Sequence, residues 1–229
     1  MPPVATLQLK DTHRLVASRY PPVGILDMVA DWNDLDLMFE LEAWTNDRIS
    51  TEVGYLHTMP RAEWVMGRPM SSVIMAAFCH ARAGGSRFNG PERGSWYAGL
   101  TIETAHAENV YHRTAELTEI GVFDTRMQMR LYLADFQAAF HDIRAPLRVN
   151  EPYHDPASYS ASQRLGRELL EQGSNGIVYR AVRHPGGECV ACFRPKLVRN
   201  VRVAGHFEYS WRGSSVPNIR RIGSRAKRR

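Results

Sequence analysis

The chain has 229 residues, of which 44% are hydrophobic and 23% are charged. This is the composition of an ordinary globular protein, and the length is ample for a hydrophobic core without disulfide or metal support. No run of about eighteen apolar residues occurs, which argues against a membrane-spanning helix. The glycine-rich patterns of the two common nucleotide-binding loops do not occur either.

The formal net charge of +5 is concentrated at the C-terminus. Residues 218–229 contain six basic residues and no acidic one, so the rest of the chain is close to neutral. No aromatic residues interleave with these charges, which argues against direct nucleic-acid binding. We expect a single domain over residues 1–217 and a disordered basic tail over residues 218–229. Contact of the tail with an acidic partner is the alternative.

The three cysteines are Cys79, Cys189 and Cys192. A sparse, odd number of cysteines without a signal peptide is typical of a reducing cytoplasm. Cys189 and Cys192 form a C-x-x-C pattern inside an expected strand, where side chains three residues apart point to opposite faces. We therefore expect neither a disulfide nor a metal site there.

The N-terminal part of the chain is expected to form a strand and loop over residues 1–24. Apolar residues at helical intervals predict helices in residues 25–50 and 60–82. Ser71 or Ser72 is the expected N-cap of the second helical region.

The middle of the chain begins with a turn-rich segment, residues 84–91. A short strand is expected over residues 95–100. Thr101 is then a suitable cap for a helix over residues 102–117. The rest of the chain alternates further strands with one helix, expected at 126–136 (strand), 160–172 (helix), 176–183 and 188–193 (a hairpin), 201–203 and 206–211 (strands). Without regular βαβ alternation, this order favours an α+β fold.

Three residues of the middle segment have side chains suited to chemistry. Arg87 lies in a glycine-flanked turn, where a guanidinium can bind a phosphate bidentately. Tyr97 lies on the following strand, where its ring can stack on a planar group. Glu108 lies on the helix, and a carboxylate can stabilise positive charge at a ribosyl carbon. Taken singly, each has a plainer interpretation as a surface turn, sheet packing or a solvated helix face.

The order and spacing of these residues resemble the RES-domain family, the toxins of RES–Xre toxin–antitoxin pairs. The resemblance spans roughly residues 12–211. The stretches that carry it are residues 84–89, 96–97 and 103–108, together with 13–22, 162–166 and 176–195.

The resemblance implies a fold similar to ADP-ribosyltransferases, with a split mixed β-core and flanking helices around an NAD⁺ cleft. Carried over by position, Arg14 and Arg87 would hold the pyrophosphate or phosphate. Arg183 lies two residues after Ala181 on the expected strand and points to the same face, so it is a further candidate to contact a phosphate. Tyr97 would contact nicotinamide or ribose, and Glu108 would be the catalytic carboxylate. NAD⁺ would be the substrate, with inorganic phosphate or water as acceptor and no permanently bound cofactor or metal. The implied partner is an Xre-like helix-turn-helix antitoxin, through which alone the chain would meet nucleic acid. A homo-oligomer is compatible with this assignment.

Ala181 departs from the family pattern, because it stands where the family usually has a substrate-binding serine. An alanine supplies no hydroxyl, and a lost contact to a charged group costs about 1.5–3 kcal/mol. The chain is therefore weakened, or Ser174 substitutes, or the protein is an attenuated variant. Three functions follow: an NAD⁺-degrading toxin, an ADP-ribosyltransferase acting on a protein, or an NAD-binding module that has lost turnover.

Overall fold

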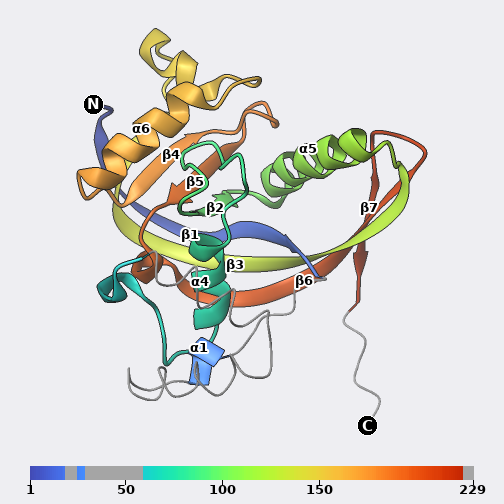
Figure 1. Cartoon of the computed structure of the whole chain (residues 1–229), viewed down its shortest axis with the longest axis horizontal. Helices are drawn as coiled ribbons and strands as arrows, with labels where there is room; N and C mark the ends of the chain where they lie inside the picture. The colour runs from blue at the N-terminus through green and yellow to red at the C-terminus, as the bar shows by residue number, and fades with distance from the viewer. Residues whose placement is uncertain (19–24, 29–58, 224–229) are drawn as a thin grey trace.

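The computed structural model describes residues 1–18, 25–28 and 59–223. It confirms the expected α+β class, with a seven-stranded mixed sheet and helices packed on both of its sides (Figure 1). The elements in chain order are β1 (Val4–Ala17), α1 (Ile25–Met28), η1 (Arg61–Glu63), α4 (Ser71–Cys79), β2 (Trp96–Gly99), α5 (Ile102–Ile120), β3 (Asp124–Asp142), η2 (Arg148–His154), α6 (Ser160–Glu171), β4 (Gly176–Arg180), β5 (Glu188–Cys192), η3 (Pro195–Leu197), β6 (Arg199–Arg212) and β7 (Asn218–Ile222).

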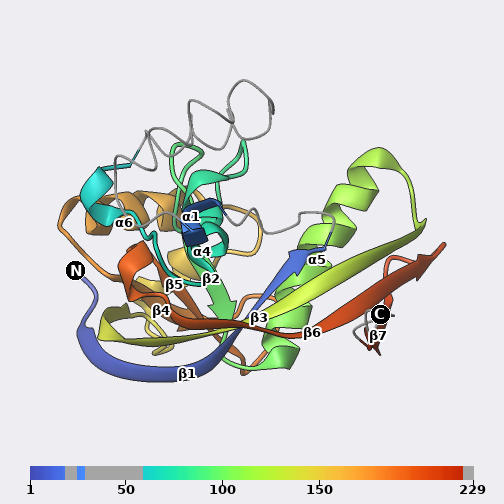
Figure 2. The ribbon, with the colours of Figure 1, turned by 90° about the horizontal axis from the view of Figure 1, so that it is seen from below.

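Long antiparallel strands form one part of the sheet. β3 pairs with β1 on one side and with β6 on the other, and β7 pairs with the outer side of β6. Figure 1 shows β3 and β6 as long arcs across the molecule, and Figure 2 shows the bend of β1. The strand expected at residues 126–136 is thus the middle of the 19-residue β3. The two short strands expected near the C-terminus are a single strand, β6.

The short strands β2, β5 and β4 form the second part of the sheet, and all their pairings with one another are antiparallel. This part joins the long strands at two places. β2 meets β1 where Gly99 pairs with His13, and β4 meets β3 in parallel where Ile177 pairs with His141. The strand pairings therefore close a circuit through β1, β2, β5, β4 and β3. The expected hairpin is confirmed, although its first strand ends at Arg180 rather than at residue 183.

Three apolar clusters form the core, each associated with a different helix. α4 packs on the cluster that contains Trp96, Phe136 and Cys192, α6 on the cluster that contains Cys189, and α5 on a third cluster built from β3 and β6. Because Cys189 and Cys192 belong to different clusters, the prediction that they lie on opposite faces is confirmed. All three cysteines are buried, and none of them is in a disulfide within the described part of the chain.

The start of α4 corrects one prediction. Neither Ser71 nor Ser72 caps the helix; its N-cap is Met70, in the left-handed conformation and without a side-chain cap. Asp27 supplies the acceptor instead, because its carboxylate accepts hydrogen bonds from the backbone N–H groups of Met70 and Ser72. A cap from a distant carboxylate has no signal in the local sequence. Of the helix expected over residues 25–50, residues 29–50 lie outside the described residues.

The C-terminal segment also differs from the expectation of a disordered tail over residues 218–229. Residues 218–222 form β7, which pairs with β6 from Asn218–Ser210 to Ile222–His206. An ion pair between Arg220 and Glu208 joins the two strands. Residues 224–229 lie outside the described part of the chain. Within that part, no helix is long and apolar enough to cross a membrane.

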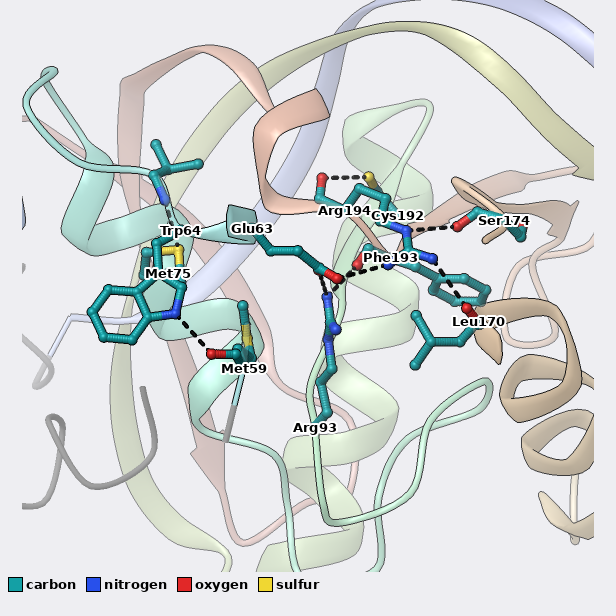
Figure 3. A network of polar contacts seen from close by, with 11 residues as sticks. Met59, Glu63, Trp64, Met75, Arg93, Leu170, Ser174, Cys192, Phe193 and Arg194 are labelled. Carbon is teal, nitrogen blue, oxygen red and sulfur yellow. Dashed lines mark hydrogen bonds and ion pairs between the residues drawn. The ribbon is translucent and has the colours of Figure 1, made fainter. Parts of the chain in front are cut away.

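A partly buried ionic network ties η1 to the end of β5 and to α6 (Figure 3). The Glu63 carboxylate accepts hydrogen bonds from the guanidinium groups of both Arg93 and Arg194. Arg93 also donates to the carbonyl oxygen of Phe193, and Arg194 donates to the carbonyl oxygens of Ser174 and Leu170. Charged groups that are partly withdrawn from water persist where each is paired and hydrogen-bonded. The network fixes the segment that leads from Arg93 into β2.

Candidate active site

A cavity of about 290 Å³ lies where β1, β2 and α5 meet the loop before β2. Four of the six residues named from the sequence line it: Arg14, Arg87, Tyr97 and Glu108. These four residues come from four different segments of the chain. The fold therefore brings their side chains to one cavity, a proximity that the sequence spacing alone does not establish. Ala181 and Arg183 are not among the residues that line the cavity.

Arg87 is almost fully buried, with 6% of its surface exposed. Its Nη1 donates to the carbonyl oxygens of Tyr153 and Asp155, at 3.3 and 2.9 Å. The guanidinium also lies over the ring of Tyr159, 4.7 Å from the ring centroid. A guanidinium oriented on several sides by fixed partners is suited to bidentate binding of a phosphate. The interpretation of Arg87 as a simple surface-turn residue is therefore wrong.

Tyr97 uses its hydroxyl group to hold the loop that carries Arg87. The oxygen accepts a hydrogen bond from the Phe88 N–H at 2.9 Å, and the O–H donates to Asn89 Oδ1 at 2.8 Å. Burial raises the pKa of the hydroxyl above its usual value, so it stays protonated. A tyrosine has one proton to donate, and here Asn89 takes it. The ring of Tyr97 lines the cavity, while its hydroxyl supports the neighbouring loop.

Helix α6 supports the same loop from the other side. Gln163 donates from Nε2 to the carbonyl oxygens of Gly84 and Ser86, at 3.0 and 3.1 Å. Gly166 lies so close that a Cβ atom there would be 2.0 Å from the carbonyl oxygen of Phe88. Only glycine permits this approach. α6 and β2 together therefore fix the backbone on both sides of Arg87.

Arg14, near the end of β1, is the second cation of the site. Its Nη1 donates to the carbonyl oxygen of Tyr97 at 3.1 Å, and its guanidinium lies 4.9 Å from the ring centroid of Trp96. Burial lowers the pKa of Arg14 to about 10, so the side chain remains charged at neutral pH. An anionic ligand would offset the cost of desolvating this cation, because a nearby opposite charge stabilises the charged form.

Glu108 lies on the cavity side of α5. Thr101 caps the helix as predicted, accepting from the Thr104 N–H. Ala105, one turn before Glu108, also lines the cavity, and its small side chain leaves room beside the carboxylate. Oε1 of Glu108 accepts a hydrogen bond from the backbone N–H of Arg183 at 3.1 Å. The interpretation of Glu108 as part of a solvated helix face is wrong, because its side chain is half-buried and lines the cavity.

Arg183 and Ala181 lie beyond the end of β4, in the turn before β5. The Arg183 guanidinium donates to the carbonyl oxygen of Pro156 and lies over the ring of Tyr111, so the contact of Arg183 with the site is through its backbone. Ala181 is buried in the α6 cluster. Ser174, the suggested substitute for the missing serine, is hydrogen-bonded to Gly176 at the start of β4 and does not line the cavity.

The cavity wall is strongly cationic. Besides Arg14 and Arg87 it includes Arg82 and Arg113, and Glu108 is the only carboxylate that lines it among the described residues. Burial, and then the nearby arginines, lower the pKa of His112 to about 4, so this imidazole is neutral at pH 7. Sequence reasoning missed Arg82, Arg113 and Tyr159, which carry no local signal beyond their residue type. In the described part of the chain, no group of three or more metal-ligating side chains occurs.

Comparison with known proteins assigns the family. The family model of the RES domain matches residues 56–212, which is more than half of the chain, and the chain therefore belongs to the RES domain family. It is 27% identical over 206 residues to the uncharacterized protein y4oC of Sinorhizobium fredii (strain NBRC 101917 / NGR234), covering 89% of this chain and 84% of that protein. The crystal structure of the M. tuberculosis MbcT–MbcA toxin–antitoxin complex matches 58% of this chain and 79% of the matched chain, at 16% identity and a TM-score of 0.41.

Proposed function

We propose that this protein is the toxin of a bacterial toxin–antitoxin pair that binds NAD⁺ and cleaves its nicotinamide–ribose bond. The observation that carries this proposal is the convergence of Arg14, Arg87, Tyr97 and Glu108 on one cavity. These are the positions to which the family resemblance assigns NAD⁺ binding and catalysis. Membership of the RES domain family supports the same function.

The charges of the cavity suit two parts of NAD⁺, the pyrophosphate and the ribose that carries nicotinamide. Arg14 and Arg87 would bind the pyrophosphate, because both are guanidinium groups at the cavity whose donors are oriented by hydrogen bonds. Glu108 would face the ribose that carries nicotinamide. As the bond between C1′ and the nicotinamide nitrogen breaks, its electron pair leaves with nicotinamide and positive charge develops on the ribosyl carbon. A nearby carboxylate stabilises that charge in the transition state.

The acceptor then attacks the ribosyl carbon. Water would yield ADP-ribose, nicotinamide and a proton, whereas inorganic phosphate would yield the 1-phosphate of ADP-ribose and nicotinamide. Both routes balance without a metal or a redox cofactor. By analogy with the family, the partner that we propose is an Xre-like antitoxin that blocks the cavity. A small helix-turn-helix protein encoded beside this chain would support this proposal.

The test is to mix purified protein with NAD⁺ and to follow nicotinamide release and the ribosyl product by NMR, with and without phosphate. We expect nicotinamide to be released by the wild-type protein, and the phosphate dependence to identify the acceptor. Labelling of a protein in a lysate, with no free ADP-ribose product, would instead support an ADP-ribosyltransferase. NAD⁺ that remains intact for hours under both conditions would contradict the proposal.

A second candidate function follows from Ala181. The family's usual serine hydroxyl is missing, and the structure packs this alanine into the core. An NAD-binding module without turnover would show a rise in melting temperature with NAD⁺ but no nicotinamide release. The same NMR assay, run beside a thermal melt, separates this candidate from the toxin.

A further inference from the structure

The turn between β4 and β5, residues 181–187, lies along one face of α5. His184 Nδ1 is 2.9 Å from Thr104 Oγ1, and the Arg183 N–H donates to Glu108 Oε1 at 3.1 Å. One turn further along the helix, the Arg183 guanidinium lies 3.4 Å from the ring centroid of Tyr111. Positions 104, 108 and 111 share one face of a helix. The turn is therefore held against α5 on both sides of Glu108.

The contact between Thr104 and His184 is built into the fold. Thr104 is fully buried, with 0% of its surface exposed, and its hydroxyl is also 3.0 Å from the hydroxyl of Thr101, the residue that caps α5. A Cβ atom on Gly187 would lie 2.5 Å from Thr104 Oγ1 and 2.6 Å from His184 Nδ1. The close approach of helix and turn thus requires glycine at residue 187.

The same turn is closed from within. The Gly187 N–H donates to the His184 carbonyl oxygen at 2.9 Å, and the Ala181 N–H donates to the Gly187 carbonyl oxygen at 2.8 Å. Arg183 is the residue next to His184, so the placement of its N–H depends on how the turn is anchored. That N–H in turn fixes one oxygen of the Glu108 carboxylate, a side chain with three rotatable torsions. Outer contacts of this kind hold functional groups within a few tenths of an ångström of the productive geometry.

We propose that Thr104 and His184 are positioning residues that set the orientation of the Glu108 carboxylate through the backbone N–H of Arg183. The proposal rests on the proposed function, because it assigns these residues to the same reaction. Neither residue lines the cavity, so neither would contact NAD⁺. Losing their contact should therefore slow the chemical step and leave NAD⁺ binding unchanged.

The experiment compares three variants in the full-length protein, with kcat and KM for nicotinamide release. His184→Ala removes the contact, and His184→Asn keeps an amide where Nδ1 lies. His141→Ala is the control, since His141 also bonds through Nδ1, but to the Pro2 carbonyl oxygen. His141 lies near the C-terminal end of β3, and it is buried where His184 is half-buried.

We expect His184→Ala to lower kcat about tenfold or more with KM within about twofold of the wild type, and His184→Asn to recover most of the loss. His141→Ala should leave both constants unchanged. A kcat for His184→Ala equal to that of the control, or a loss seen in KM alone, would overturn the proposal.

Hydrogen exchange at residues 181–187 separates this proposal from the proposed function. If the wild-type protein releases no nicotinamide, the proposed function fails, and exchange alone then tests the anchor. Faster exchange at the Arg183 amide in His184→Ala, but not in His141→Ala, supports control of the Glu108 contact by the turn. Equal exchange in the two variants overturns it.

Discussion

The cationic and anionic sides of the cavity are held in different ways. The Arg87 loop has support from both directions. Tyr97 on β2 binds Phe88 and Asn89 of the loop, and Gln163 and Gly166 approach the loop from α6. Arg87 itself is also tied to two carbonyl oxygens and an aromatic ring. Glu108 has one described hydrogen bond, from the N–H of Arg183.

The difference is consistent with two separate tasks. A site that binds an anion benefits from donors that are fixed before the ligand arrives. The loss of side-chain and loop entropy then occurs on folding and does not weaken ligand binding. A carboxylate that acts on a developing charge must be oriented but also left open to the reacting carbon, and fewer bonds achieve this. We therefore expect changes near Arg87 to alter binding and loop stability, and changes at Glu108 to alter turnover.

The largest expected effect is that of Glu108→Gln on nicotinamide release. The amide has the same shape and can still accept the hydrogen bond from Arg183, so only the negative charge is lost. We expect release to fall about 100- to 1000-fold, corresponding to about 3–4 kcal/mol, with the melting temperature unchanged. A variant with wild-type release would show that the carboxylate takes no part in the reaction.

A second effect concerns His112, whose pKa of about 4 reflects burial and the crowded arginines. The unfolded chain has the ordinary value of 6.5 and takes up the proton first. The contribution of neutral His112 to the free energy of unfolding is thus fully present above pH 6.5. It is lost as the pH falls from about 6.5 to about 4, which lowers the free energy of unfolding by up to about 3 kcal/mol. Urea unfolding at pH 7 and pH 4.5 measures this loss.

His112→Gln should show a smaller loss of stability over the same pH interval than the wild type. Other histidines with lowered pKa values, His13, His106 and His154, contribute in both proteins and cancel in the comparison. The same pH dependence in variant and wild type would mean that His112 is not held neutral by its surroundings.

Gly166→Ala should disturb the Arg87 loop, because its Cβ would meet the Phe88 carbonyl oxygen at 2.0 Å. We expect a loss of about 1–3 kcal/mol in the free energy of unfolding and weaker NAD⁺ binding. Gly84→Ala is the control. Gly84 lies in the Arg87 loop itself, and a Cβ atom there would meet nothing within 4 Å. Equal stability of the two variants would contradict the close approach of α6.

Tyr97→Phe should have the smallest effect. The ring stays in the cavity wall, while the Phe88 N–H and Asn89 Oδ1 lose their shared partner. We expect a loss of about 1 kcal/mol in the free energy of unfolding and a fewfold rise in the dissociation constant of NAD⁺, with kcat nearly unchanged. A large drop in kcat at constant affinity would instead assign the hydroxyl to the chemical step.

The sequence predicted those elements whose signals are local. Thr101 identified the start of α5, and the turn at residues 184–187 identified the β4–β5 hairpin. The lengths of β1, β3 and β6 could not be predicted, because their pairing joins residues such as Thr12 and Ala134 that are far apart in the chain. β7 was missed for the same reason: its pairing with β6 outweighs its basic composition.

The candidate site shows the same division. Arg87, Tyr97 and Glu108 were found from their spacing and the family resemblance, and the cavity confirms that they lie together. The support of Arg87 by Gln163 and Tyr159, and that of Glu108 by the turn at residues 181–187, comes from contacts between distant segments. A sequence pattern carries no record of such contacts, so only the fold reveals them.

The most direct test is a titration of NAD⁺ into the Glu108→Gln and Arg87→Gln variants by calorimetry. We expect Glu108→Gln to bind NAD⁺ with nearly the wild-type affinity. Arg87→Gln should lose about tenfold or more in affinity, the cost of a lost charged hydrogen bond. Equal affinity of the two variants, or weaker binding only in Glu108→Gln, would contradict the division of the cavity into a binding side and a reacting side.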